Sequence, residues 1–152
     1  MRVQLEFRAP CSPDAAWEVI TSPSELANAY APVLTLHTDD PIPERWRSGD
    51  EVVVELRFLG ALPVGRQRIA IRTRRRGETR ILEDAGRPLA GPLALVTSWR
   101  HRMAVTPLPD GGALYRDRLD VSAGLLTPVV WFGMWTVWQL RGASLRRTMR
   151  SR

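Results

Sequence analysis

The sequence contains no lysine, and all 22 of its strongly basic side chains are arginines. With 16 acidic residues they give a formal net charge of +6, which can indicate a nucleic-acid or anionic-membrane partner. The densest run, five arginines between 72 and 80, lies on both sides of Gly77 and includes no aromatic residue that could stack on bases. The absence of lysine beside abundant Arg, Ala, Gly and Pro is also typical of codon bias. We therefore expect no nucleic-acid partner.

Cysteine is almost absent. The single Cys11 cannot form an internal disulfide and has no companions for a metal site. His37 precedes Asp39 and Asp40, but this spacing is more typical of a surface turn than of a metal site. The sequence therefore predicts neither a metal nor a cofactor.

The chain also lacks an apolar run long enough to cross a membrane. Residues 121–140 carry no ionisable side chain, but polar residues and Pro128 interrupt their first part. Proline favours the first turn of a helix, and the uncharged remainder, 129–140, then spans only about 18 Å of a core about 30 Å thick. Residues 1–10 alternate between apolar and polar side chains, unlike a signal peptide. We expect a cytoplasmic protein.

The N-terminal third predicts one strand followed by two short helices. Residues 3–7 alternate with period two and predict a half-buried strand that ends at Pro10. Ser-Pro pairs at 12–13 and 22–23 combine an N-cap residue with a first-turn proline. They predict two short helices, of which the second ends near Tyr30.

From residue 32 onward the period changes to two, and turn residues recur about every ten positions, which indicates antiparallel strands. Six strands are expected, near 33–38, 51–59, 66–74, 79–85, 95–106 and 113–122. With the first strand they make seven in one α+β domain covering residues 1–152. Such a sheet must cover its apolar face, and the C-terminal helix is the element long enough to do so.

That helix is expected to begin at about Pro128. Steps of three and four place six residues on one stripe: Trp131, Trp135, Trp138, Gly142, Leu145 and Met149. Arg146, Arg147 and Arg150 lie off the stripe. We therefore expect the tryptophans to face the sheet. Phe132 and Val137 point away from it, which predicts either a contact in a homodimer or a transient membrane contact.

The order of these elements resembles the START-like, Bet v 1-like (SRPBCC) superfamily. The stretches "APCSPDAAWEVITSPSELANAY", "RSGDEVVVELRFLG" and "SWRHRMAVTPLPDGGALYRDRLDV" are similar to that superfamily's opening helices, its glycine-led third strand and its late hairpin. The resemblance spans essentially the whole chain and is greatest to the polyketide cyclase/dehydrase and lipid-transport group. It implies a helix-grip fold, in which a curved antiparallel sheet wraps around a long C-terminal helix, and an apolar ligand between them.

Two polar residues and a tyrosine fall on the inward face of the last two strands, namely His101, Asp117 and Tyr115. Pairing residues whose numbers sum to about 218 places His101 opposite Asp117, and Tyr115 opposite Met103. Asp117 could then orient His101 as a general base. Alternatively, the two form a satisfied internal pair, because a buried aspartate is costly unless it is paired.

The sequence therefore favours a binder of an apolar small molecule of lipid, polyketide or isoprenoid type. The expected wall of the cavity consists of Trp99, Met103, Leu119, Val121, Trp131, Trp135, Trp138 and Tyr30. The alternative is a polyketide cyclase or dehydratase that uses His101, Asp117 and Tyr115. A third hypothesis is a peripheral membrane protein, in which the tryptophans and the C-terminal arginines dock on anionic lipid.

Overall fold

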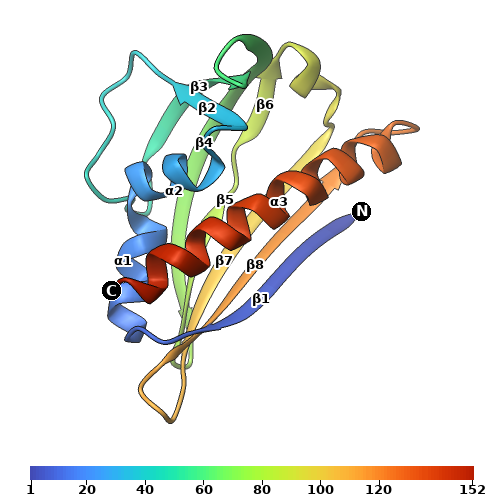
Figure 1. Ribbon diagram of the computed structural model, residues 1–152. Coiled ribbons are helices and arrows are strands. Elements are labelled where there is room, and N and C mark those ends of the chain that lie inside the picture. Colours follow the sequence, from blue (N-terminus) through green and yellow to red (C-terminus); the bar gives the residue numbers. More distant parts are fainter.

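A curved antiparallel sheet holds the C-terminal helix in the computed structural model, which describes residues 1–152 (Figure 1). The strands are β1 (Arg2–Ala9), β2 (Leu34–His37), β3 (Glu51–Phe58), β4 (Leu62–Arg76), β5 (Thr79–Asp84), β6 (Arg87–Ala90), β7 (Ser98–Pro107) and β8 (Ala113–Ser122). The helices are α1 (Pro13–Thr21), α2 (Pro23–Tyr30), the 3-10 helix η1 (Pro92–Leu95) and α3 (Thr127–Arg150). Neighbouring strands follow the order β1-β8-β7-β5-β4-β3-β2, and β6 pairs with β4. This is the predicted helix-grip fold.

The Ser-Pro signals start both short helices as predicted. The Ser12 hydroxyl accepts a hydrogen bond from the Ala15 amide at 3.1 Å, and the Ser22 hydroxyl accepts one from the Glu25 amide at 3.3 Å. A proline occupies the first turn of each helix, where its missing N–H has no partner to lose. The same holds for α3, whose first turn contains Pro128.

The sheet has eight strands where the sequence predicted seven. The additional strand, β6, comes from the stretch that was expected to be a turn, and η1 follows it, so β7 begins at Ser98 and not at residue 95. Gly86 makes the strand possible, because a Cβ at this position would lie 1.8 Å from the Arg68 carbonyl oxygen. The chain can therefore leave β5 and pair at once with the part of β4 that extends beyond β5.

The hairpin of β7 and β8 is shifted by one pair from the predicted register. Residues pair with numbers that sum to 220, so His101 faces Leu119, and Met103 faces Asp117. The turn centres on Asp110, whose carboxylate accepts a hydrogen bond from the Gly112 amide at 3.1 Å. The shift is diagonal and leaves every residue on its predicted face.

The C-terminal helix leans on one side of the concave face. α3 packs on β1 and α2 and makes fewer contacts with the centre of the sheet (Figure 1). Gly142 allows the close approach to β1, since a Cβ there would lie 2.8 Å from Leu5 Cδ1. The inner faces of β3, β4 and β5 consequently lie across a gap from α3 that side chains only partly fill.

The predicted apolar stripe of α3 is buried only in its C-terminal part. Trp138, Leu145 and Met149 are buried, whereas Trp131 is half-buried and donates its indole N–H to the Arg2 carbonyl oxygen at 2.7 Å. The expectation that Trp135 faces the sheet is wrong, because this side chain is 41% exposed. The N-terminal turns of α3 extend toward an end of the molecule where little of the sheet covers them (Figure 1). No helix here combines the length and hydropathy that a membrane span needs.

Candidate functional site

An apolar cavity lies between α2, α3 and the inner face of the sheet. It encloses about 120 Å³ and is lined by 22 residues, of which 17 are hydrophobic. The strands contribute Leu34, Leu36, Val54, Leu56, Val64, Gln67, Ile69, Ile71, Leu82, Asp84, Trp99, His101 and Met103. The helices and loops contribute Pro23, Leu26, Ala27, Tyr30, Trp46, Leu93, Met134, Trp138 and Arg141. The wall is thus apolar except for a few polar groups toward β5, β7 and α3.

Five of the residues singled out from the sequence line this cavity, namely Tyr30, Trp99, His101, Met103 and Trp138. The remaining six do not: Tyr115, Asp117, Leu119, Val121, Trp131 and Trp135. Leu119 and Val121 pack instead against Trp138 in a cluster beneath α3. The cavity therefore lies nearer to β3 and β4 than the sequence predicted.

Asp117 collects four hydrogen bonds at the back of the site. Its Oδ1 accepts from His101 Nε2 at 2.7 Å and from the Trp138 indole N–H at 3.1 Å. Its Oδ2 accepts from the Tyr115 hydroxyl at 2.7 Å and from Arg141 Nη1 at 2.8 Å. Asp117, Tyr115 and Arg141 are all fully buried. The predicted pairing of His101 with Asp117 is thus present, as part of a larger network.

Charge and hydrogen bonding decide the protonation states in this network. Burial opposes ionisation of Asp117, but the Arg141 guanidinium, then His101, and the hydrogen bonds from His101 and Tyr115 hold its pKa well below the usual range. Burial and the neighbouring Asp117 charge raise the pKa of Tyr115 well above 10. Tyr115 therefore stays a neutral donor to an ionised Asp117.

An ionised Asp117 fixes the tautomer of His101. A carboxylate only accepts hydrogen bonds, so the Nε2 atom of His101 must carry the proton that it shares with Asp117. Whenever the ring is neutral, its Nδ1 atom is then an unprotonated acceptor, and the side-chain hydrogen bond of His101 within the protein is the one that Nε2 makes. Since His101 lines the cavity, this lone pair is available to a ligand.

A second buried carboxylate, Asp84, borders the cavity beside His101, its neighbour across the β5–β7 pair. Its Oδ1 accepts from the backbone amides of Ala70 and Gly86 at 3.0 and 2.9 Å. Its Oδ2 accepts from Gln67 Nε2 at 3.2 Å and from the Trp99 indole at 3.3 Å. Asp84 and Asp117 therefore each accept four hydrogen bonds from the protein itself.

Arg141 is likewise committed to the protein. Its Nη1 donates to Asp117, its Nη2 lies 2.9 Å from the Met103 sulfur, and its Nε is buried without a partner. The guanidinium also lies over the Tyr30 ring, 5.0 Å from the centroid. Arg141 was missed from the sequence although it stands three residues after Trp138, a spacing that places both on one helix face.

Apart from the buried Nε of Arg141, three polar atoms of the lining residues are free of partners within the protein: Nδ1 of His101, the side-chain carbonyl of Gln67 and the hydroxyl of Tyr30. Burial raises the pKa of Tyr30 to about 12, so this hydroxyl keeps its proton. The first two atoms only accept hydrogen bonds, while Tyr30 can also donate. The site thus offers its free acceptors to a ligand that carries a donor.

The weaker candidates from the sequence lie elsewhere. His37 is at the exposed end of β2, where its Nε2 lies 3.1 Å from the Thr35 hydroxyl. No three His, Cys, Asp or Glu side chains come together as a metal site would require.

Comparisons with known proteins agree with the architecture. No protein-family model and no curated protein matches this sequence. A hypothetical protein of Helicobacter pylori superposes with a TM-score of 0.70 at 13% identity, covering 99% of this chain and 88% of that one. A protein of Chromobacterium violaceum gives 0.65 at 14% identity, covering 98% and 96% of the two chains.

A third similar structure is a norcoclaurine synthase point mutant from Thalictrum, solved with a transition-state analogue. Its TM-score is 0.63 at 12% identity, with 98% of this chain and 93% of that chain covered. At these identities the likeness shows the fold alone. The chain therefore has a helix-grip fold.

Proposed function

We propose that this protein binds a compact, apolar and uncharged small molecule of lipid, polyketide or isoprenoid type in the cavity between the sheet and α3. The observation that carries the proposal is the composition of the wall, which has 17 hydrophobic residues and three polar atoms without a partner in the protein. Burying apolar ligand surface would drive binding at about 25 cal/mol per Å².

The size of the cavity limits the ligand. About 120 Å³ is close to the roughly 150 Å³ of an engineered apolar cavity that admits benzene, and below the 300–1,000 Å³ of sites for drug-sized molecules. By this comparison the cavity as it stands admits a ligand of about six carbon atoms, and one of about ten enters only if the lining side chains move outward. A long acyl chain would require the walls to move apart.

The charges around the cavity exclude a carboxylate as the ligand's polar group. Asp84 lines the cavity and Asp117 lies behind its wall. Arg141, the only buried arginine, is already paired with Asp117. A ligand carboxylate would meet the acceptors of His101 and Gln67 with no free cation, and burying an unpaired charge costs several kcal/mol. A hydroxyl group can donate to these acceptors instead.

Geraniol and geranic acid share a carbon skeleton and differ only in this polar group, so they test the proposal. Titration of either compound can be followed by the fluorescence of Trp99 and Trp138, which line the cavity. We expect geraniol to bind saturably at neutral pH. We expect the affinity for geranate to be lower by a factor of at least about ten. Absence of geraniol binding, or equal affinity for geranate, would contradict the proposal.

The free Nδ1 of His101 favours a second function, that of a polyketide cyclase or dehydratase. Nδ1 would take a proton from the carbon next to a ligand carbonyl, and Asp117 would stabilise the resulting imidazolium. The enolate carbon would then form a bond to a second carbonyl of the same molecule, and the imidazolium would return its proton to the new alkoxide. Tyr115, which does not line the cavity, would position Asp117 in this scheme.

Proton exchange tests this alternative without knowledge of the substrate. If His101 acts as a base, the protein accelerates exchange of the methyl protons of acetophenone in D₂O, as measured by NMR. His101→Ala should abolish the acceleration and change geraniol affinity only a few-fold. An unaccelerated wild-type rate, or an unchanged rate in the variant, would exclude catalysis by His101.

A further inference from the structure

Large apolar side chains are exposed in three uncharged segments of the chain. These segments, residues 58–65, 88–99 and 121–140, contain no ionisable side chain. Eleven of the thirteen large hydrophobic residues that are exposed fall in these segments. In a chain that is 25% charged, this concentration of exposed apolar side chains exceeds what scattered surface residues would give.

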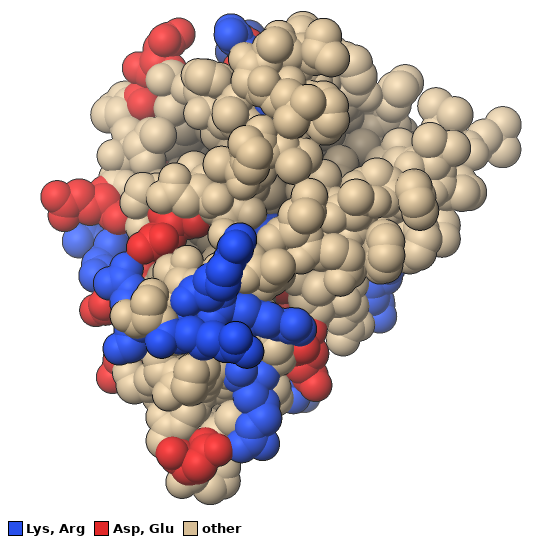
Figure 2. Space-filling model, viewed as in Figure 1, with Lys and Arg blue, Asp and Glu red and all other residues tan.

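The three segments meet in the fold. A Cβ on Gly91 would lie 2.8 Å from the Gly65 Cα, so the first two segments are in direct contact. Leu93 and Val64 then pack in one hydrophobic cluster with Met134 of α3. Figure 2 shows the result as a continuous tan surface over the N-terminal half of α3 and the elements beside it. We call this surface the apolar cap, made up of Phe58, Leu59, Leu62, Leu89, Leu95, Leu125, Leu126, Val129, Phe132 and Trp135.

The side chains of the cap project into solvent. Val129 and Phe132 are 72% and 63% exposed, and Phe132 stacks on Trp135 with ring centroids 6.2 Å apart. Aromatic and branched apolar residues of this kind insert into the interfacial region of a bilayer.

Arginines border the uncharged segments. Arg57 and Arg66 flank the first, and Arg87 and Arg100 flank the second. Arg57 pairs with Glu55 and Arg100 with Glu83, whereas Arg66 and Arg87 are exposed and form no salt bridge. An apolar surface with free guanidinium groups at its edge complements a bilayer whose headgroups are anionic.

We propose that the apolar cap docks on an anionic lipid bilayer, with Arg66 and Arg87 at the level of the phosphates. A contact between two copies fits less well, because it would bring these arginines together at an interface whose three segments hold no carboxylate to pair with them. Leu93, Val64 and Met134 lie under the cap and also line the cavity, so docking places this wall at the membrane. The docking itself does not depend on the proposed ligand.

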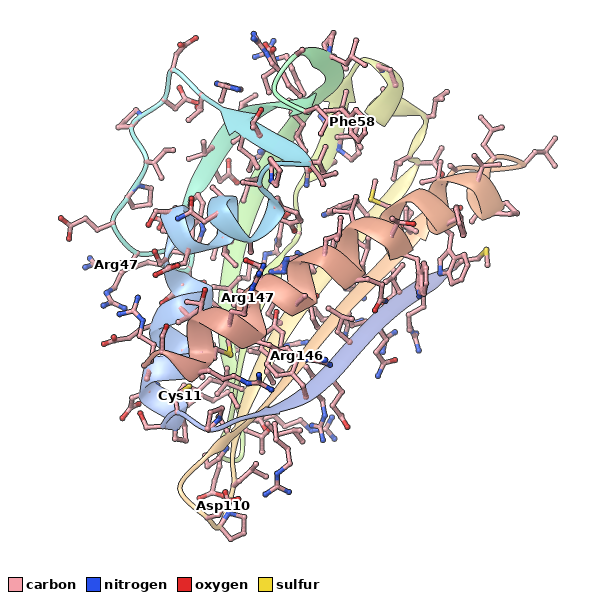
Figure 3. The ribbon with its side chains drawn as sticks, in the orientation of Figure 1. Cys11, Arg47, Phe58, Asp110, Arg146 and Arg147 are labelled. Carbon is pink, nitrogen blue, oxygen red and sulfur yellow. The ribbon has the colours of Figure 1, made fainter.

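This arrangement differs from the membrane contact predicted from the sequence, which combined the tryptophans with the C-terminal arginines. Figure 3 shows Arg146 and Arg147 on the C-terminal half of α3, whereas Phe58 lies at the end with the cap. Helix α3 has 24 residues and a length of about 36 Å, too long for both of its ends to touch one interface when it is steeply inclined. The free arginines nearest the cap are those of β4 and β6.

Co-sedimentation with vesicles of phosphatidylcholine, alone or mixed with phosphatidylglycerol, tests the docking. We expect wild type to bind the mixed vesicles at low salt and the Val129→Ser/Phe132→Ser variant to bind about tenfold less. Ile42→Ser is the matched control, because Ile42 is 53% exposed but lies outside the cap, and it should bind like wild type. Arg66→Gln/Arg87→Gln should lose the preference for phosphatidylglycerol, while Arg147→Gln should keep it.

Wild type that fails to bind mixed vesicles overturns the proposal, as does equal binding by the cap variant. The alternative occupant of the apolar cap is a second copy of this chain, which sedimentation velocity of the same proteins would detect. If wild type forms a dimer and Val129→Ser/Phe132→Ser abolishes it, the cap is a dimer interface. Geraniol titration of that variant should match wild type. The docking and the proposed ligand can therefore fail separately.

Discussion

We expect Asp117→Leu to lower the free energy of unfolding by about 3–5 kcal/mol, the cost of leaving a buried ion without its partner. In the native state Asp117 accepts four hydrogen bonds, including one from Arg141, and both residues are fully buried. Without the carboxylate, the guanidinium stays charged because an arginine side chain does not lose its proton in proteins. It then lacks the Asp117 charge that opposes the effect of burial, which lowers the pKa of Arg141. Urea unfolding near neutral pH measures the loss.

The double variant Asp117→Leu/Arg141→Leu is the control for this prediction. It removes both charges, so we expect it to be more stable than Asp117→Leu alone, because apolar replacement of a whole buried pair is often neutral. A double variant less stable than Asp117→Leu would mean that the network is not held together by this ion pair.

The same aspartate shapes the response to acid. Asp117 titrates near 3.9 in the unfolded chain and well below that in the native state, so its contribution is complete above about pH 4 and declines as the pH falls further. Asp120 lies on the outer face of the sheet. Partial burial raises its pKa, but hydrogen bonds from Arg2 and Arg118 outweigh this effect and lower the pKa to about 2. Asp117→Leu should therefore lose stability less steeply than wild type below about pH 4, and Asp120 should leave a residual slope in both.

Filling the cavity with Val54→Phe should weaken geraniol binding by about a hundredfold or more, with little change in stability. Val54 is buried on β3 and lines the cavity, so the larger side chain can occupy existing space. A ligand would then compete with a covalently attached ring, and about 2.7 kcal/mol of lost contact corresponds to a hundredfold change in affinity. The fluorescence titration and urea unfolding measure the two effects.

Val52→Phe is the matched control. Val52 lies on the same face of the same strand and is equally buried, but it does not line the cavity. Overpacking a filled core costs about 1–3 kcal/mol, so this variant should lose stability where Val54→Phe does not. Equal destabilisation by both substitutions would show that no usable space exists beside Val54.

Much of the fold could be predicted from the sequence because its signals are local. Two Ser-Pro pairs mark helix starts, and alternation along β7 and β8 separates inward from outward residues. The strand β6 could not be predicted, because its pairing depends on how far β4 extends past β5 and on the close approach at Gly86. The register of the late hairpin was missed by one pair, because several geometries suit a turn that contains Pro109, Asp110 and two glycines.

The candidate site was predicted less completely. His101 and Asp117 lie together as expected, but the position of the cavity follows from the tilt of α3 toward β1, which no local pattern encodes. That tilt leaves Trp135 exposed and leaves a cavity that Asp84, which was not among the predicted site residues, helps to line. The spacing of Arg141 from Trp138 could have placed it on the buried face of α3. A charged residue on that apolar stripe is explained only by its pairing with Asp117, which the sequence does not reveal.

The four methionines provide the most direct test of an apolar ligand in this cavity. Met103 and Met134 line it, Met149 is buried in the core away from it, and Met1 is exposed. With ¹³C-labelled methionine methyl groups, titration with geraniol should shift the resonances of Met103 and Met134 to saturation and leave those of Met149 and Met1 in place. Unchanged spectra, or shifts that spare Met103 and Met134, would contradict the account.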